Sequence, residues 1–196
     1  MPERKIILGV TGSIAAYKSV ILLRLLQKQG FDVHVVMTES ATKFVAPLTF
    51  KSLSKHPVAL DMFDENINWA TKHISLAENA DVFVVAPCTA NTAAKIAHGI
   101  ADNILTCTAL SVECPVVIAP AMNFRMWANK ATEDNMAILK KRGVTVIKVT
   151  DGELACGEEG SGRMAEPEII LDVCLLYTSD AADDLLCVDL GGRRII

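Results

Sequence analysis

Five short apolar segments, each followed by a stretch with helical spacing, constrain the fold of this chain more than any other feature. The segments span residues 5–11, 31–38, 81–87, 114–120 and 144–149. Each is close to continuously apolar rather than alternating, which is typical of strands in a parallel sheet that is covered on both faces. Because strands and helices alternate along the chain, parallel β-α-β units are expected. The pattern therefore predicts an α/β fold: an open, doubly wound parallel sheet in a three-layer α/β/α domain.

The segments between these strands carry helix signals. Ser13 stands where it can cap a helix from residue 14 to about residue 29, and Gly30 ends that helix. Residues 55–72 show no regular pattern. Further helical segments are expected within residues 38–45, 47–53, 73–80, 89–101, 102–111 and 121–143.

Composition excludes several classes of protein. With 51% hydrophobic and 21% charged residues, the chain has enough apolar material for one globular core. Its net charge is −4 and its basic residues are scattered, so we expect no nucleic-acid partner. No apolar run reaches the ~20 residues that span a bilayer, so we expect no membrane partner. The segment MPERKIILGV lacks a signal-peptide layout, and a cytoplasmic location is predicted.

The six cysteines form no C-x-x-C pair, so neither a zinc ribbon nor a thioredoxin-like motif is indicated. We expect no metal and reduced thiols. Cys107 and Cys114 stand in apolar neighbourhoods and are predicted to fill core space.

Four loops are candidates for ligand binding, because open parallel sheets bind ligands beyond the carboxyl ends of their strands. They span residues 11–14, 37–41, 86–92 and 119–127. The first, a glycine and a serine at a strand-to-helix turn, suits an anion at a helix amino end, but equally suits plain turn chemistry. It matches neither G-x-G-x-x-G nor the P-loop pattern.

The later loops add polar and apolar groups. In the third loop, Thr89, Asn91 and Thr92 suit hydrogen bonds to a flat heteroaromatic edge, or simply a capped helix. In the fourth, Met and Trp side chains form an apolar wall with Asn123 as a polar anchor, or they fill core. His73 stands alone at the start of a helical segment, where a helix amino end favours the neutral base form.

The segment LACGEEGSGRMAEP, residues 154–167, combines three glycines with Cys156 and Arg163. A loop this rich in glycine is not expected to hold one shape unaided. It can therefore fold over a bound molecule and exclude water.

Together the stretches GVTGSIAAYK, TKHISLA, APCTANTAAKIAHGIADN, APAMNFRMW and LACGEEGSGRMAEPEII resemble the homo-oligomeric flavin-containing cysteine decarboxylases. The resemblance runs from about residue 4 to residue 172 and is strongest to the members that act on phosphopantothenoylcysteine. It implies a Rossmann/flavodoxin-like fold with FMN bound between subunits of a homotrimer or a homododecamer.

The resemblance also assigns residues. Gly12, Ser13 and Ile14 match the family's residues at the flavin phosphate, and Ser40 matches their partner at a helix end. The segment around the flavin ring is matched by Pro87, Thr89, Asn91 and Thr92. Catalytic positions are matched by His73, Asn123 and Cys156. Substrate contacts are expected from Met122, Asn123 and Arg163.

The implied reaction is the FMN-dependent decarboxylation of 4′-phosphopantothenoyl-L-cysteine to 4′-phosphopantetheine in coenzyme A biosynthesis. Oxidation of the substrate thiol to a thioaldehyde creates an electron sink, so that CO2 can leave, and the resulting enethiol is then reduced. His73 would act as general base, Asn123 would orient the carboxylate, and the Cys156 thiol would donate a proton.

Residues 173–196 do not resemble the family and look like translated sequencing adapter, with an acidic tail as the alternative. We therefore predict a decarboxylase domain over residues 1–172, a non-native tail over 173–196, and no ligase domain of the kind that follows in bifunctional members. Two other functions stay open. One is a peptidyl-cysteine decarboxylase, and the other is a non-catalytic, FMN-binding regulatory protein.

Overall fold

The computed structural model describes residues 4–62, 76–153 and 159–178. Its centre is a five-stranded parallel sheet with the strand order β2-β1-β3-β4-β5, which is the flavodoxin-like order. The strands are β1 (Lys5–Val10), β2 (Asp32–Met37), β3 (Ala80–Cys88), β4 (Val116–Pro120) and β5 (Thr145–Val146). The predicted doubly wound α/β fold is confirmed.

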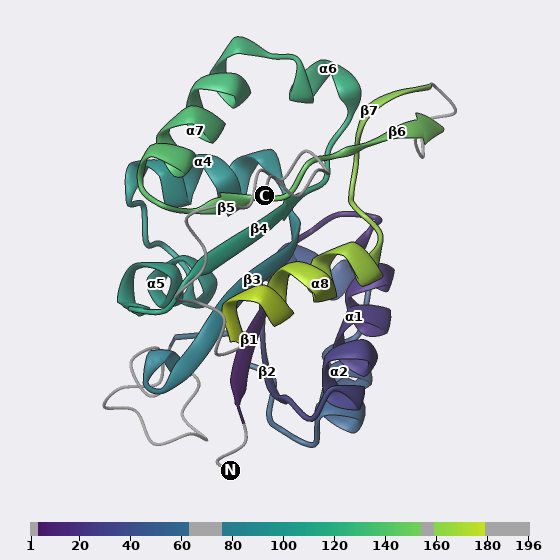
Figure 1. Cartoon of the computed structure of the whole chain (residues 1–196), viewed down its shortest axis with the longest axis vertical. Coiled ribbons are helices and arrows are strands. Elements are labelled where there is room, and N and C mark those ends of the chain that lie inside the picture. Colours follow the sequence, from purple (N-terminus) through teal and green to yellow (C-terminus); the bar gives the residue numbers. More distant parts are fainter. Residues whose placement is uncertain (1–3, 63–75, 154–158, 179–196) are drawn as a thin grey trace, which may run out of the picture.

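Helices cover both faces of the sheet (Figure 1). On one side lie α1 (Ala16–Lys28), α2 (Pro47–Ser54) and α8 (Pro167–Thr178). On the other lie α4 (Ala90–His98), α5 (Ile104–Ser111) and α7 (Lys130–Lys141). Two short elements, the 3₁₀ helix η1 (Glu39–Lys43) and α6 (Phe124–Trp127), follow β2 and β4.

Strand β1 shows why the strand segments are continuously apolar. Ile6 and Leu8 pack into the core beneath α1 and α8, whereas Ile7 packs into the core on the opposite face. All three side chains are fully buried. Since successive side chains of a strand point to opposite faces, a strand covered on both sides needs an apolar residue at every position.

Two elements differ from their predicted form. The helix expected after Thr38 is only the five-residue 3₁₀ turn η1. Strand β5 has two residues rather than six: the Ile147 N–H still donates to the Ile118 carbonyl, and the chain then leaves the sheet. It continues into an antiparallel hairpin of β6 (Thr150–Glu153) and β7 (Glu159–Arg163).

Helix α8 runs without a break across the predicted domain boundary at residue 172. Val173 and Cys174, which follow that boundary, are buried in the core with α1. Burial raises the pKa of the Cys174 thiol to about 12. The division into residues 1–172 and 173–196 stays a prediction, although the first residues of the second part belong to the packed fold.

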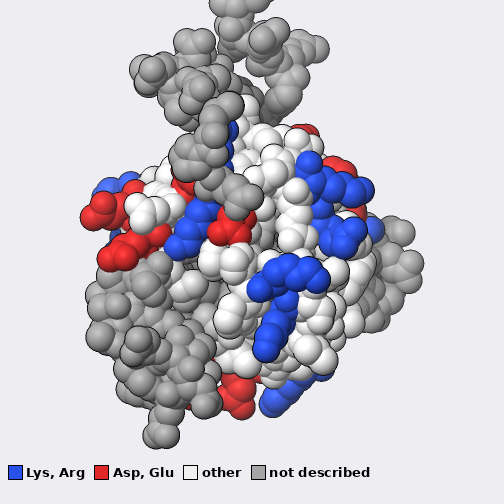
Figure 2. All heavy atoms as spheres, turned by 90° about the horizontal axis from the view of Figure 1, so that it is seen from below, with Lys and Arg blue, Asp and Glu red and all other residues white. Residues whose placement is uncertain are grey.

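Two features concern surfaces. In the described part of the chain, no helix combines the length and the apolar character that crossing a membrane requires. Figure 2 shows one face on which Lys and Arg side chains stand in separate small groups, with acidic and uncharged surface between them.

Helix α5 offers a matched test of the core. Leu105 is fully buried, whereas Leu110 is 58% exposed on the same helix. Leu105→Ala should lower the free energy of unfolding by about 2–5 kcal/mol, because it removes buried methyl groups and leaves a cavity. Leu110→Ala should change it by less than about 0.5 kcal/mol. Urea unfolding followed by circular dichroism measures both, and equal losses would contradict this account of the core.

Candidate functional site

The carboxyl ends of the central strands meet at one edge of the sheet. The strand order reverses direction between β1 and β3, because β1 is followed in the chain by β2 on one side and pairs with β3 on the other. Crevices at such switch points are where open α/β sheets bind ligands. All four candidate loops lie at this edge, because they follow the carboxyl ends of β1, β2, β3 and β4.

The first two loops touch directly. A Cβ atom on Gly12 would lie 2.5 Å from the Cβ of Ser40, so only glycine allows this approach. Ser13 is half-buried, and its hydroxyl accepts a hydrogen bond from the Ala15 N–H just before α1. Ile14 is 60% exposed. The structure thus brings the predicted Gly12, Ser13 and Ser40 together beside the amino end of a 13-residue helix.

Thr38, at the end of β2, lies in the second candidate loop, and its hydroxyl was not among the residues assigned to the flavin phosphate. Its N–H donates to the Val10 carbonyl at the end of β1. Its Oγ1 is buried and has no hydrogen-bond partner among the residues that the structure describes. A buried hydroxyl without a partner is costly, and a ligand oxygen at this edge would satisfy it.

Thr11 ties the first loop to the third. Its hydroxyl donates to the Pro87 carbonyl (2.7 Å) and accepts from the Thr89 N–H (3.1 Å). The side chain is 1% exposed, so both bonds are shielded from water. Thr11 belongs to the first candidate loop, but the sequence assigned it no role. The signal was available, since Thr11 and Thr38 are both the polar residue that directly follows a buried strand.

The predicted residues of the third loop divide into two groups. Thr89 caps α4 by accepting from the Thr92 N–H, and its hydroxyl also donates to the Thr92 hydroxyl. Pro87 is buried, whereas Asn91 is exposed. Thr89 and Thr92 therefore serve the cap that the sequence left as an alternative, and Asn91 lies at the surface. Cys88 is fully buried, which raises the pKa of its thiol to about 12.

The fourth loop is held between the third loop and the hairpin. The Ala121 N–H donates to the Cys88 carbonyl, and the Met122 N–H donates to the Gly162 carbonyl. Asn123 caps α6: its Oδ1 accepts from the Arg125 N–H at 2.9 Å. This bond fixes the orientation of the Asn123 amide. Met122 and Trp127 are partly buried and pack against the core, as the core-filling interpretation predicts, and an apolar wall for a ligand stays a prediction.

The glycine-rich segment is more regular in its described parts than the expected loop. It forms β7 of the hairpin, and its glycines permit two close approaches. A Cβ on Gly160 would lie 2.8 Å from the Cβ of Phe124, and one on Gly162 would lie 2.3 Å from the Met122 carbonyl oxygen. These glycines therefore serve backbone packing against α6 as well as flexibility.

A buried lysine anchors the base of the hairpin. The Lys18 ammonium, with its side chain 5% exposed, donates to the Met164 carbonyl (3.2 Å) and to Glu166 Oε1 (2.9 Å). Arg163, expected to contact substrate, also donates to Glu166 Oε1 at 3.0 Å. These hydrogen bonds, the Lys18 one foremost, hold the pKa of the Glu166 carboxyl below its ordinary value. Lys18 and Glu166 were not selected from the sequence.

Two predicted catalytic residues, His73 and Cys156, lie outside the described residues. The chain on either side of Cys156 is described: β6 ends at Glu153 and β7 begins at Glu159. Their roles stay predictions.

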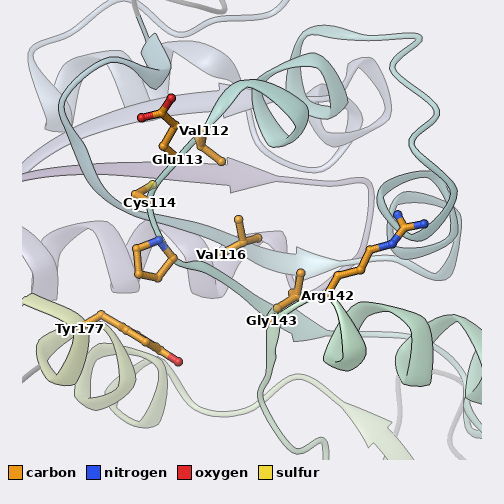
Figure 3. Close-up of a pocket in the computed structure, with 9 residues that line it drawn as sticks. Val112, Glu113, Cys114, Val116, Arg142, Gly143 and Tyr177 are labelled. Carbon is orange, nitrogen blue, oxygen red and sulfur yellow. The ribbon is translucent and has the colours of Figure 1, made fainter. Parts of the chain in front are cut away.

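A separate pocket of about 420 Å³ lies at the opposite edge of the sheet, at the amino end of β4. Figure 3 shows its lining, with Tyr177 of α8 across from Cys114 and Val116. Cys114 is only half-buried here, and Cys107 is also partly exposed, so neither is the plain core residue that we predicted. The pocket is remote from the four loops and takes no part in the site.

The fold and this edge define an open, flavodoxin-like α/β protein, a class that binds its ligands at the switch point of the sheet. Comparison with protein families gives the more specific class. The flavoprotein family matches residues 1–177, and the chain belongs to this family.

Among curated relatives, a probable phosphopantothenoylcysteine decarboxylase of Streptococcus mutans is 46% identical over 170 residues, which cover 86% of this chain and 95% of the relative. The coenzyme A biosynthesis bifunctional protein CoaBC of Bacillus subtilis is 46% identical over 194 residues, 99% of this chain and 47% of the relative. The chain thus spans about half the length of its bifunctional relatives.

Solved structures are similar over the same region. A PPC decarboxylase with a cysteine-to-serine substitution, complexed with pantothenoylaminoethenethiol, is 36% identical with a TM-score of 0.79, covering 90% of this chain and all of that one. The FMN binding protein AtHal3 is 36% identical with a TM-score of 0.77, covering 89% of this chain and 96% of that one.

The anchor at Glu166 should make stability depend on pH. Because its pKa is lowered in the folded state, the carboxylate stabilises the fold above its ordinary pKa of about 4.3, and this contribution is lost as the pH falls through the folded-state value. Glu166→Gln should cost about 1 kcal/mol or less at pH 7, since the half-exposed carboxylate is screened. The difference from the parent should shrink below about pH 4.

Urea unfolding at a series of pH values measures this difference. Glu133→Gln is the matched control, because Glu133 forms a wholly exposed pair with Lys130. A difference between Glu166→Gln and the parent that grows on acidification would overturn the assignment.

Proposed function

We propose that this protein is an FMN-dependent carbon–carbon lyase that decarboxylates 4′-phosphopantothenoyl-L-cysteine to 4′-phosphopantetheine in coenzyme A biosynthesis. The observation that carries the proposal is the meeting of the four loops at the sheet's switch point. It includes the Gly12–Ser40 contact and a buried Thr38 hydroxyl that finds no hydrogen-bond partner in the described part of the chain. The names of the relatives from Streptococcus mutans and Bacillus subtilis support the substrate and pathway. A cytoplasmic location stays a prediction.

The residues at this edge fit the phosphate of FMN. Gly12 keeps the backbone open where a side chain would collide with Ser40, and Ser13 precedes the amino end of α1. Helix amino ends and hydroxyl donors bind phosphate oxygens well. Ser13, Ser40 and the Thr38 hydroxyl would hold the phosphate, with Ile14 beside it. The similar solved structure of AtHal3, an FMN binding protein, supports this choice of cofactor.

The isoalloxazine ring would lie along the third and fourth loops. Asn91 is exposed there and offers an amide edge, while Pro87 and Thr92 shape the loop from within. Thr89 holds the loop through its hydrogen bonds to Thr11 and Thr92. Bound FMN would supply a hydride acceptor when the substrate thiol is oxidised, and would return the hydride once CO2 has left.

The chain's own residues would bind, orient and move protons. Asn123, with its Oδ1 held by the Arg125 N–H, would present its NH2 group to the substrate carboxylate, and Met122 would form an adjacent apolar wall. An amide orients a carboxylate without neutralising it, so the carboxylate can still leave as CO2. His73 would take the proton of the substrate thiol.

Cys156 would donate the proton that completes the reduction. Its segment joins β6 to β7, and the hydrogen bonds of Lys18 to Met164 and Glu166 anchor the end of that hairpin. Arg163 lies at the same end and shares Glu166. The neighbouring PPC decarboxylase with a cysteine-to-serine substitution is complexed with an ethenethiol, the kind of unsaturated thiol expected when reduction does not take place. This supports a reductive role for a cysteine.

We further propose that FMN lies between subunits of a homotrimer or homododecamer. Ile14, in the turn just before α1, and Tyr17 and Ile21 on α1 are exposed apolar residues spaced three and four positions apart, with exposures of 60%, 54% and 45%, and are called the stripe below. Phe44 and Leu48 are also exposed on the elements after β2. Contiguous apolar surface of this kind usually marks an interface. The stripe begins at residues 11–14, the loop proposed to hold the FMN phosphate and called the phosphate loop below. A second subunit that packs on the stripe would therefore border the cofactor.

Anaerobic incubation of the purified protein with 4′-phosphopantothenoylcysteine, followed by mass spectrometry, tests the function. The parent should release CO2 and give 4′-phosphopantetheine. Cys156→Ser should release about one CO2 per bound flavin and give a product lighter by two hydrogens, because the proton donor is missing and the two electrons stay on the flavin when no oxidant is present. The saturated product at the parent's rate from Cys156→Ser would overturn the role of Cys156.

Two other outcomes separate the alternatives. Turnover of a peptide with a carboxyl-terminal cysteine, but not of the phosphorylated substrate, would favour a peptidyl-cysteine decarboxylase. Bound FMN with no turnover of either substrate would favour a regulatory flavin-binding protein. Either result would reject the proposed function.

The interface makes a second prediction. Tyr17→Glu should lower the molar mass measured by light scattering towards that of one chain, because a carboxylate would be buried in an apolar contact. The same variant should retain less FMN after gel filtration. Leu110→Glu, at an equally exposed leucine on α5, is the control and should keep the parent's mass and flavin content. An unchanged mass for Tyr17→Glu would contradict an interface at the stripe.

A further inference from the structure

Two histidines and one aspartate converge at the edge of the sheet opposite to the four loops. Asp32 Oδ2 lies 2.8 Å from His34 Nε2, and Asp32 Oδ1 lies 2.6 Å from His56 Nε2. The two imidazole rings are stacked, with their centroids 4.1 Å apart and their planes 19° from parallel. The donor atoms of all three residues lie within 4.8 Å of one another.

The local fold explains how residues 24 positions apart come together. Asp32 and His34 are two residues apart in β2, so their side chains share one face of the strand. Val33 and Val35 point to the other face and are buried beneath α1. His56 follows the end of α2.

The position of His56 is fixed by two further contacts. The Ser54 hydroxyl accepts from the His56 N–H (3.1 Å) and donates to the His56 carbonyl (3.3 Å). Three residues later, Ala59 forms a parallel bridge with Val36 at the outer edge of β2. The backbone that carries all three side chains is therefore set by the sheet edge before any ligand binds.

We infer that Asp32, His34 and His56 form a binding site for a divalent transition-metal ion, for which Zn²⁺ is the natural probe. Two imidazoles and one carboxylate are a donor set that such ions favour, with water completing the coordination. Zinc bonds of ~2.0–2.2 Å require the ligand atoms to separate by roughly 0.5 Å from their present contacts. The side chains are 23–34% exposed, so they can move and the ion can reach them.

No metal was expected from the sequence, because its cysteines form no C-x-x-C pair. This grouping has no such short motif, since His56 comes from a different element and only the strand-edge bridge brings it to Asp32. Lys5 on β1 is the register partner of Asp32 on β2, and its ammonium donates a hydrogen bond to the Glu78 carbonyl (2.9 Å). Lys5 would weaken but not block the binding of a cation.

The site lies at the amino end of β2, whereas Thr38 follows the carboxyl end. The strand's length places the two roughly 16 Å apart. Zinc binding is thus expected to stabilise the start of β2 and the chain after α2 without contact with the phosphate loop. Because zinc would bind the folded chain, it should raise the melting temperature by mass action.

Zinc titration of the chelator-treated protein, in competition with a chromophoric chelator, tests this inference. The parent should bind one equivalent per chain more than the double variant His34→Gln/His56→Gln, and each single variant should lose at least ~10-fold in affinity. At about 100-fold excess over its dissociation constant, zinc should raise the melting temperature of the parent by about 5–10 °C. The double variant should lack this shift.

Two controls keep the test specific. His98→Gln changes a histidine that hydrogen-bonds only the Asn135 side chain among the contacts described, and it should bind zinc like the parent. Co²⁺ in the parent should give visible absorption without the near-ultraviolet sulfur-to-cobalt band, which excludes binding through cysteine. Equal zinc binding by the parent and a folded double variant, or a cobalt spectrum with the sulfur band, would overturn the inference. So would no binding at zinc concentrations well above that of the protein.

Discussion

The buried hydroxyl of Thr11 is the contact on which the geometry of the candidate site depends. It bonds both the Pro87 carbonyl and the Thr89 N–H, and so joins the loop after β1 to the loop after β3. Backbone hydrogen bonds extend this connection: the Ala121 N–H donates to the Cys88 carbonyl, and the Met122 N–H donates to the Gly162 carbonyl. Each link satisfies a backbone group that would cost about 1–3 kcal/mol if it were buried without a partner. The loops are therefore coupled through backbone groups, which leaves their outer side chains available for a ligand.

Close backbone approach is the second constraint, and it accounts for the glycines of the motifs better than flexibility alone does. Gly12 meets Ser40, Gly160 meets Phe124, and Gly162 meets the Met122 carbonyl at distances that no Cβ could share. In both glycine-rich segments, a missing side chain lets one loop rest on the next. Residues 160–163, which follow Cys156 in the same glycine-rich stretch, therefore rest on the chain at residues 122–124.

The sequence predicted the fold well, because both-face burial makes each strand of a parallel sheet visible as an apolar run. Prediction was weaker where side chains serve other protein groups. Thr89 and Thr92 suited either ligand contacts or a helix cap, and the structure shows the cap, while a contact with a ligand stays a prediction. Lys18 gave no signal, since its partners Met164 and Glu166 are about 150 residues away in the chain. The roles of His73 and Cys156 rest on resemblance alone.

Exclusion of water decides whether this edge of the sheet can support the proposed chemistry. Electron and proton transfer to a carbanion-like centre need a site closed to solvent. In one chain the phosphate loop ends at Ile14, which is 60% exposed, and Asn91 is exposed as well. A single chain therefore leaves the candidate site open on the side of α1. The exposed stripe on α1 offers the surface through which a second chain would close that side, while the hairpin anchored by Lys18 approaches from the side of α6. If the chains assemble through this stripe, assembly and catalysis would share one requirement, because the apolar surface that would draw the chains together would also remove water from the proposed cofactor site.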